Sequence, residues 1–153
     1  RRSLTRLKTD AVDLLFLHAP AADLQVLNET DAVEALQELK TQGLTRAIGF
    51  SAKTPPAALQ ALDWADALMV EYHLHDQTMA DVIQQAAQRG VAIIVKKALA
   101  SGTLPTAEAL EFVLQNLAVA SVVIGTLNLD HMRANLAIAE KTRRGVTDSS
   151  CRA

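Results

Sequence analysis

Polar side chains that could do chemistry stand at intervals along the sequence, each directly after a short apolar run. His18 ends the run VDLLFLH, Ser51 follows RAIGF, Lys96 and Lys97 follow VAIIV, and Thr126 follows SVVIG. An imidazole can hydrogen-bond a carbonyl oxygen, and hydroxyl and ammonium groups can hold a polar or anionic ligand. The question is which fold would bring these residues to one place.

A second candidate is the stretch IGTLNLDHMRAN, which joins an apolar run to a helical pattern. Thr126 and Asn128 offer a hydroxyl and an amide, and His131 and Arg133 lie in the first turns of the predicted helix. Free N–H groups and the helix dipole favour a phosphate at such a position. An ordinary helix start capped by Asn128 explains the same residues.

The other candidates also have structural explanations. His18 could be a strand-end histidine bonded to the backbone, and Ser51 could cap the loop before the helix that begins near Thr54. Lys96 and Lys97 could be solvated at a strand end, or could meet the negative charge of a cofactor. Residue type and spacing alone leave these alternatives open.

The apolar runs predict five strands that alternate with amphipathic helices. Because the runs are almost continuously apolar, both faces of the sheet should be buried, as in a parallel sheet covered by helices. The carboxyl ends of parallel strands meet at one edge, where such folds bind ligands. The polar ends, Glu71 and Tyr72 included, should therefore share one rim. The predicted strands are Val12–His18, Arg46–Phe50, Ala67–Glu71, Val91–Lys96 and Ser121–Ile124.

Helical spacing and helix-end residues predict the connecting segments. Thr54 caps a helix with Pro55 at its first position, and Gly43 and Gly90 end two others. Residues 1–141 form one α/β domain, and the polar segment 142–153, which contains Cys151, is predicted to be a disordered tail. The predicted helices cover residues 1–7, 30–43, 54–65, 78–90, 106–116 and 129–141.

Composition excludes several classes of protein. The chain has 153 residues, a net charge of −2 and 3% aromatic residues, which argues against nucleic-acid binding. No apolar run is long enough for a membrane span, and no G-x-G-x-x-G motif follows a strand. His73 and His75 are interpreted as surface residues, since no carboxylate or cysteine stands at a spacing that completes a metal site. A cytoplasmic, metal-free protein is expected.

Five blocks of the sequence resemble, in the same order, the C-terminal portion of the aldo-keto reductase family, from the fourth strand of its barrel onward. They lie between residues 3 and 140 and read SLTRLKTDAVDLLFLHAP, ALQELKTQGLTRAIGFSAKTP, ALMVEYHL, GVAIIVKKALASGTL and VVIGTLNLDHMRANLA. The resemblance implies a partial (β/α)8 TIM barrel that holds strands 4 to 8. A complete barrel needs eight units and typically about 250 residues.

The resemblance also implies a function, the reduction of aldehydes or ketones to alcohols with NADPH, or with NADH, and without a metal. His18 stands at the position of the catalytic histidine that orients the carbonyl. The aspartate, tyrosine and lysine that complete the family's catalytic group come from the first three units and are not in this chain. We therefore expect this incomplete chain to be inactive alone.

The implied cofactor contacts match the family unevenly. Ser51 matches the serine that holds the nicotinamide carboxamide, but Ala52 and Met69 replace the usual asparagine and glutamine, and Lys96 replaces a stacking aromatic residue. Further cofactor contacts are implied for Thr126, Asn128, His131, Arg133 and Asn135, the last near the adenine.

These departures leave a second hypothesis, a non-catalytic regulatory or remnant protein that binds a nicotinamide nucleotide. The expected partner is a small carbonyl substrate, with no nucleic acid and no membrane. Copies of the chain could also associate through exposed sheet edges.

Overall fold

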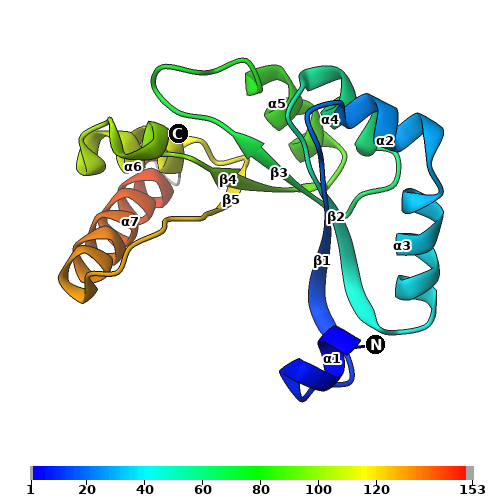
Figure 1. The fold of residues 1–153 in the computed structure, drawn as a ribbon. Helices are drawn as coiled ribbons and strands as arrows, with labels where there is room; N and C mark the ends of the chain where they lie inside the picture. Colours follow the sequence, from blue (N-terminus) through cyan, green and yellow to red (C-terminus); the bar gives the residue numbers. More distant parts are fainter. Residues whose placement is uncertain (1, 151–153) are drawn as a thin grey trace.

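The computed structural model describes the backbone of residues 2–150 and the side chains of residues 2–145. Its five strands form one sheet in the order β1-β2-β3-β4-β5, and every neighbouring pair is parallel (Figure 1). The predicted α/β fold of five strands alternating with helices is confirmed. The strands are β1 Val12–His18, β2 Thr45–Ser51, β3 Ala67–Glu71, β4 Ala92–Lys96 and β5 Val119–Val122.

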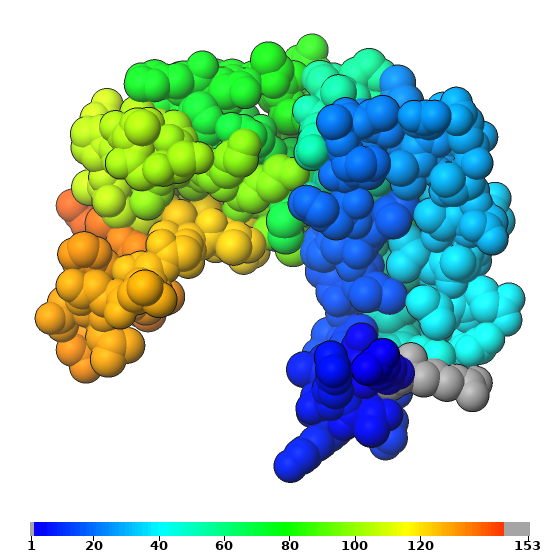
Figure 2. Space-filling view, viewed as in Figure 1, coloured from blue at the N-terminus to red at the C-terminus, as the bar shows by residue number. Residues whose placement is uncertain are grey.

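The helices cover the convex side of a curved sheet, and the concave side faces an open hollow (Figures 1 and 2). The chain traces an arch in Figure 2, with α1 and α7 at its two ends. The helices are α1 Arg2–Leu7, α2 Asp23–Glu29, α3 Ala32–Thr41, α4 Pro55–Ala61, α5 Ala80–Gln88, the short 3-10 helix η1 Ala100–Gly102, α6 Thr106–Gln115 and α7 Leu129–Ser150.

Strand alternation divides the side chains between the two faces of the sheet. Phe50, Leu68 and Ile93 are fully buried and belong to the core between sheet and helices. On the concave side the ring of Phe16 lies against Gly49, so closely that a Cβ on Gly49 would clash with it. Residues that alternate with the core positions therefore line the hollow, and this face carries the polar strand ends.

Two kinds of helix-end signal predicted from the sequence are confirmed, the glycines that end helices and the cap at Thr54. Gly43 and Gly90 have φ angles of +72° and +73°, which suit glycine and turn the chain after α3 and α5. The Thr54 side chain accepts a hydrogen bond from the Ala57 N–H, and Pro55 begins α4. The turns at Gly43 and Gly90 precede β2 and β4, and the cap at Thr54 follows the end of β2.

Several elements differ from the expectation, among them the short helix η1, which was not predicted, and α4, which ends at Ala61. Helix α2 was also not predicted, and β5 begins and ends two residues earlier than predicted, next to a register shift between Ile93 and Ile94. Helix α7 continues to Ser150, so residues 142–150 are helical instead of disordered. The Thr142 hydroxyl donates to the Ile138 carbonyl, and the Arg143 guanidinium donates to the Val119 carbonyl. Cys151 lies outside the described residues.

None of the described helices combines the length and the apolar character that crossing a membrane requires.

Candidate functional site

The carboxyl ends of β1 and β2 bring His18 and Ser51 side by side, because these residues are register partners. Ser51 is level with Met69 on β3, and Lys96 is level with Glu71. The His18 side chain is exposed, and no hydrogen bond to its imidazole occurs among the described residues. Its imidazole is therefore open to a ligand, which favours the functional interpretation over that of a histidine bonded to backbone.

Lys96 and Ser51 are in direct contact, although they are 45 residues apart in the sequence. The Lys96 Nζ donates to Ser51 Oγ at 3.0 Å and to the Ala52 carbonyl oxygen at 3.0 Å. Ser51 is only 2% exposed, and Lys96 is half-buried. The ammonium group therefore covers the hydroxyl, and Lys96 is not simply a solvated lysine at a strand end.

The two neighbouring lysines have different surroundings. Burial lowers the pKa of Lys96 below the usual 10.5, and the charge of Lys97 lowers it further, while the carboxylate of Glu71 acts in the opposite direction. Lys97 is 53% exposed and pairs with Glu71 at 2.6 Å. Lys97 thus already has an anionic partner, whereas the oxygens that Lys96 bonds to among the described residues are neutral.

Asp23 supports the site, although the sequence did not single it out. It is 2% exposed at the start of α2, and its carboxylate accepts bonds from the Lys53 and Thr54 N–H groups and from the Thr54 hydroxyl at 2.7–3.0 Å. Desolvation by burial raises the pKa of this carboxyl, but these bonds and that of Leu24 N–H outweigh it, so the pKa lies below its usual value. Asp23 thereby fixes the loop that follows Ser51.

The structure corrects the interpretation of His73, which lies in the loop after β3. His73 is 6% exposed rather than a surface residue, and Glu71 and Asp76 lie close enough to it to offer ligand atoms within 4.8 Å of one another. However, the His75 N–H donates to His73 Nδ1, which leaves the proton of the neutral ring on Nε2, facing Glu71 Oε1 at 3.4 Å. That tautomer suits a hydrogen bond to Glu71 and opposes metal binding through Nε2.

Tyr72 also lies elsewhere than expected. The sequence predicted a polar strand end at the rim, but the Tyr72 ring is buried and stacks on Phe112 with ring centroids 5.2 Å apart. Tyr72 follows Glu71 by one residue, so strand alternation turns it toward the helices.

The predicted phosphate turn gathers Thr126, Asn128 and His131 around one shallow surface depression after β5. Asn128 Oδ1 caps α7 by accepting from the N–H groups of Asp130 and His131, at 2.8 and 3.4 Å. The Asn128 N–H in turn donates to Thr126 Oγ1. The backbone donors at this helix start are therefore largely satisfied within the turn.

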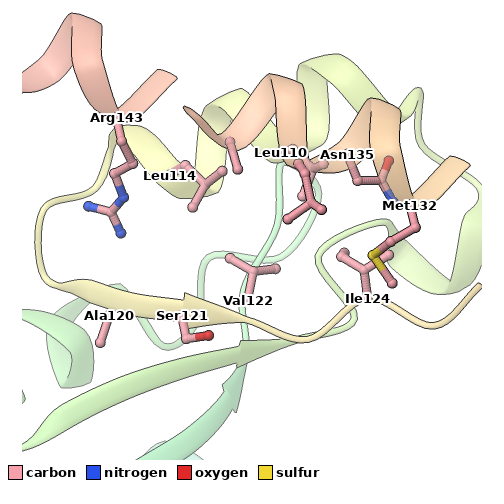
Figure 3. A pocket seen from close by; sticks show the side chains of 11 residues that line it. Leu110, Leu114, Ala120, Ser121, Val122, Ile124, Met132, Asn135 and Arg143 are labelled. Carbon is pink, nitrogen blue, oxygen red and sulfur yellow. The ribbon is translucent and has the colours of Figure 1, made fainter. Parts of the chain in front are cut away.

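Arg133 and Asn135 are separated from that depression. Arg133 pairs with Asp130 at 2.9 Å, and both side chains are exposed. Asn135 borders a cavity of about 370 Å³ between α6, α7 and β5, where it lies beside Met132 and opposite Ile124 (Figure 3). Most of the other lining residues are apolar, among them Leu110 and Leu114.

The family model of the aldo/keto reductase family matches residues 1–109. The chain belongs to this family. The resemblance predicted from the five sequence blocks is confirmed.

Three relatives give the extent of the likeness. A solved aldo-keto reductase from Pseudomonas aeruginosa is 39% identical, with a TM-score of 0.87 over 92% of this chain and 54% of that chain. The uncharacterised oxidoreductase YqkF of Bacillus subtilis is 22% identical over 94% of this chain and 60% of its own length. D-threo-aldose 1-dehydrogenase of a Pseudomonas species is 30% identical over 69% of this chain and 34% of its own length. This chain thus spans between a third and three fifths of these relatives.

Aldo/keto reductases generally use a nicotinamide cofactor, so the donor set can be compared with what such a dinucleotide requires. The rim offers an ammonium and a hydroxyl at Lys96 and Ser51, which suit a carboxamide oxygen. The start of α7 offers a positive dipole end together with His131, which suit a phosphate, while Arg133 is paired with Asp130. The chemical types of these groups fit the cofactor. For the carboxamide oxygen, Lys96 is a more accessible donor than Ser51.

Proposed function

We propose that this chain is the cofactor-binding side of an NADPH-dependent carbonyl reductase that converts aldehydes or ketones into alcohols. The observation that carries the proposal is the alignment of His18, Ser51 and Lys96 on the concave face, at the carboxyl edge of parallel strands. Family membership supports an oxidoreductase. The relatives' names agree on redox chemistry but not on one substrate, so we name the class no more narrowly than aldehydes and ketones.

His18 would orient the substrate, because its exposed imidazole can donate a hydrogen bond to the carbonyl oxygen. When bound, the nicotinamide cofactor supplies the hydride that adds to the carbonyl carbon. The oxygen then needs a proton, which in the family comes from a tyrosine assisted by a lysine and an aspartate. Tyr72 does not offer that proton, since it is buried against Phe112.

The remaining candidate residues would hold the cofactor. We assign the carboxamide to Ser51 and Lys96, and the phosphate to the turn around Asn128. NADPH is proposed over NADH because His131 and Arg133 add two basic side chains to a helix start that already favours anions. The full assignment of phosphate and adenine contacts is Thr126, Asn128, His131, Arg133 and Asn135.

NADPH oxidation with a panel of aldehydes tests the proposal. The 153-residue chain should turn over about 10²- to 10⁴-fold more slowly than the Pseudomonas aeruginosa relative assayed beside it, because a positioned general acid contributes a factor of this size. A hybrid that adds the relative's first three βα units should recover turnover and lose it again on His18→Phe. Turnover equal to the relative's by the chain alone would refute the proposed dependence on a missing proton donor, and a folded hybrid without turnover would refute the reductase.

A second function, nucleotide binding without catalysis, is favoured by Ala52 and Met69, which remove two neutral polar side chains from the rim. Calorimetry separates the two functions, since a non-catalytic protein would bind NADPH in the hybrid but show no turnover. A remnant without its own function would neither bind NADPH nor show turnover. Copies of such a remnant should associate through the open edges of β1 and β5, which static light scattering of the chain would detect. A cytoplasmic location remains part of this proposal.

A further inference from the structure

Lys96 occupies a position on the concave face that a ligand at the rim would meet first. Its Nζ reaches across β3 to Ser51 Oγ and the Ala52 carbonyl, each at 3.0 Å. An ammonium group has three N–H donors, and these contacts use two of them. The third is unused among the described residues, so Lys96 can still donate one hydrogen bond.

Ser51 is a less accessible donor than Lys96. It is 2% exposed, and its hydroxyl oxygen already accepts from Lys96. Its neighbours Ala52 and Met69 carry no polar donor. A carboxamide oxygen that approaches Ser51 from the open side therefore meets the charged donor of Lys96 before it meets the hydroxyl.

The charge of Lys96 is only partly compensated by its surroundings. Lys53 and Lys97 are the other cations that act on it, and Glu71 and Asp23 are the anions. Glu71 is bonded to Lys97 at 2.6 Å, and Asp23 is occupied by the N–H and O–H donors of the loop after Ser51. Three cations thus face two anions that already have partners, and the site keeps a positive potential.

We propose that Lys96 makes this site select the reduced form of a nicotinamide dinucleotide over the oxidised form. The inference rests on the proposed function, because it needs the nicotinamide at the rim. The dihydronicotinamide ring of the reduced form is neutral, whereas the ring of the oxidised form carries a positive charge. The Lys96 ammonium can bond to the carboxamide in both forms but repels only the charged ring.

The selectivity follows from electrostatics and should be measurable. Two unit charges a few ångströms apart near a protein surface interact strongly enough to change a dissociation constant by roughly tenfold or more. The phosphate and adenine groups are the same in both forms, so their contribution cancels in the ratio of the two constants. This ratio isolates the effect of the ring charge from a general loss of affinity.

The test measures Kd for NADPH and for NADP⁺ by calorimetry on the 153-residue chain and three Lys96 variants. The wild type should bind NADPH roughly tenfold more tightly. Lys96→Gln, which is neutral but can still donate to Ser51, and Lys96→Met should bring the ratio close to one. Lys96→Arg should keep the preference. Lys53→Met, which removes an exposed cation nearby, should change the ratio by less than about twofold, as expected for a screened charge.

The outcomes separate this inference from the function on which it rests. If the wild type binds NADPH but Lys96→Gln leaves the ratio unchanged, the Lys96 inference is wrong and the cofactor site stands. If the wild type binds both forms equally, the inference is also wrong. If neither form binds to the folded wild type, the proposed cofactor site and the inference fail together. Circular dichroism of each variant confirms that a changed ratio comes from a folded chain.

Discussion

The centre of the sheet and its β5–α7 end both carry candidate site residues, but they hold them by different means. At the centre, Ser51 lies among strand residues that are almost completely buried, such as Phe50 and Leu68. At the β5–α7 end, Leu127 and Leu129 are exposed beside the turn of Asn128. Packing between the sheet and its covering helices positions the central residues, whereas hydrogen bonds within one turn position those at the end.

This difference has a consequence for the two halves of the proposed cofactor site. By the resemblance, the central half is expected to depart from the family in its residue types, at Ala52, Met69 and Lys96, yet its geometry is firmly set. The end half keeps plausible phosphate contacts, yet its donors are bonded to one another. A firm scaffold tolerates new side chains on its open face, while a loosely packed turn depends on a few particular residues.

The largest expected effect comes from the centre. In Gly49→Ala the new Cβ would lie 2.7 Å from the Ala67 carbonyl oxygen and even closer to the Phe16 ring. Because the backbone of β3 cannot move aside, we expect the free energy of unfolding to fall by about 3 kcal/mol. Urea denaturation measures it.

Gly145→Ala at the other end is the matched control. A Cβ there has open space and lies within a helix, so we expect a gain of about 0.5–1 kcal/mol. Equal losses of the free energy of unfolding in Gly49→Ala and Gly145→Ala would contradict the difference in packing between the two regions.

The second effect tests the loop that follows Ser51. Asp23→Ala should lower the free energy of unfolding by about 2–4 kcal/mol at neutral pH, since buried N–H groups lose a charged acceptor. The folded-state pKa of Asp23 is depressed, so its contribution is present above the usual carboxyl pKa and is lost as the pH falls through the folded value. The difference from wild type should therefore shrink in acid.

Asp13→Ala is the control for that loop variant. Its ion pair with Arg46 is exposed on both sides, and we expect a change below about 0.5 kcal/mol. A pH-independent loss in Asp23→Ala would show that packing, and not the charge, holds the loop.

The smallest effect concerns the turn before α7. Asn128→Ala removes the acceptor for the N–H groups of Asp130 and His131 and should destabilise the helix by about 1 kcal/mol. Hydrogen exchange at these two amides should accelerate, while amides in β3 stay protected. Asn128→Ser should largely restore protection, because serine is also a good cap. Faster exchange in β3 as well would mean that the two regions unfold together.

The strands were predictable because each is a nearly continuous apolar run between turn signals, and Gly43 and Gly90 do end their helices at positive φ. Helix α2 was missed because seven residues carry too little periodicity, and Asp23 was missed with it. The end of α7 was missed because bonds such as that of Arg143 to Val119 come from tertiary contact.

For the site, sequence could predict the rim but not its contacts. Parallel strands require His18, Ser51 and Lys96 to share an edge, and they do. That the Lys96 side chain crosses a whole strand to bond to Ser51 and to the Ala52 carbonyl is a tertiary contact, which no spacing in the sequence indicates. The burial of His73 likewise depends on how the loop after β3 folds back.

The order of the strands allows the sheet to form from the N-terminus to the C-terminus during synthesis. Each strand pairs with the one made just before it, from β1 to β5. As the chain leaves the ribosome from its N-terminus, every new strand and helix therefore meets an edge that is already finished. Each parallel pairing spans a helical crossover, so it forms more slowly than the contacts within a helix. The sheet can therefore add one strand and one helix at a time without separating the strands that have already paired.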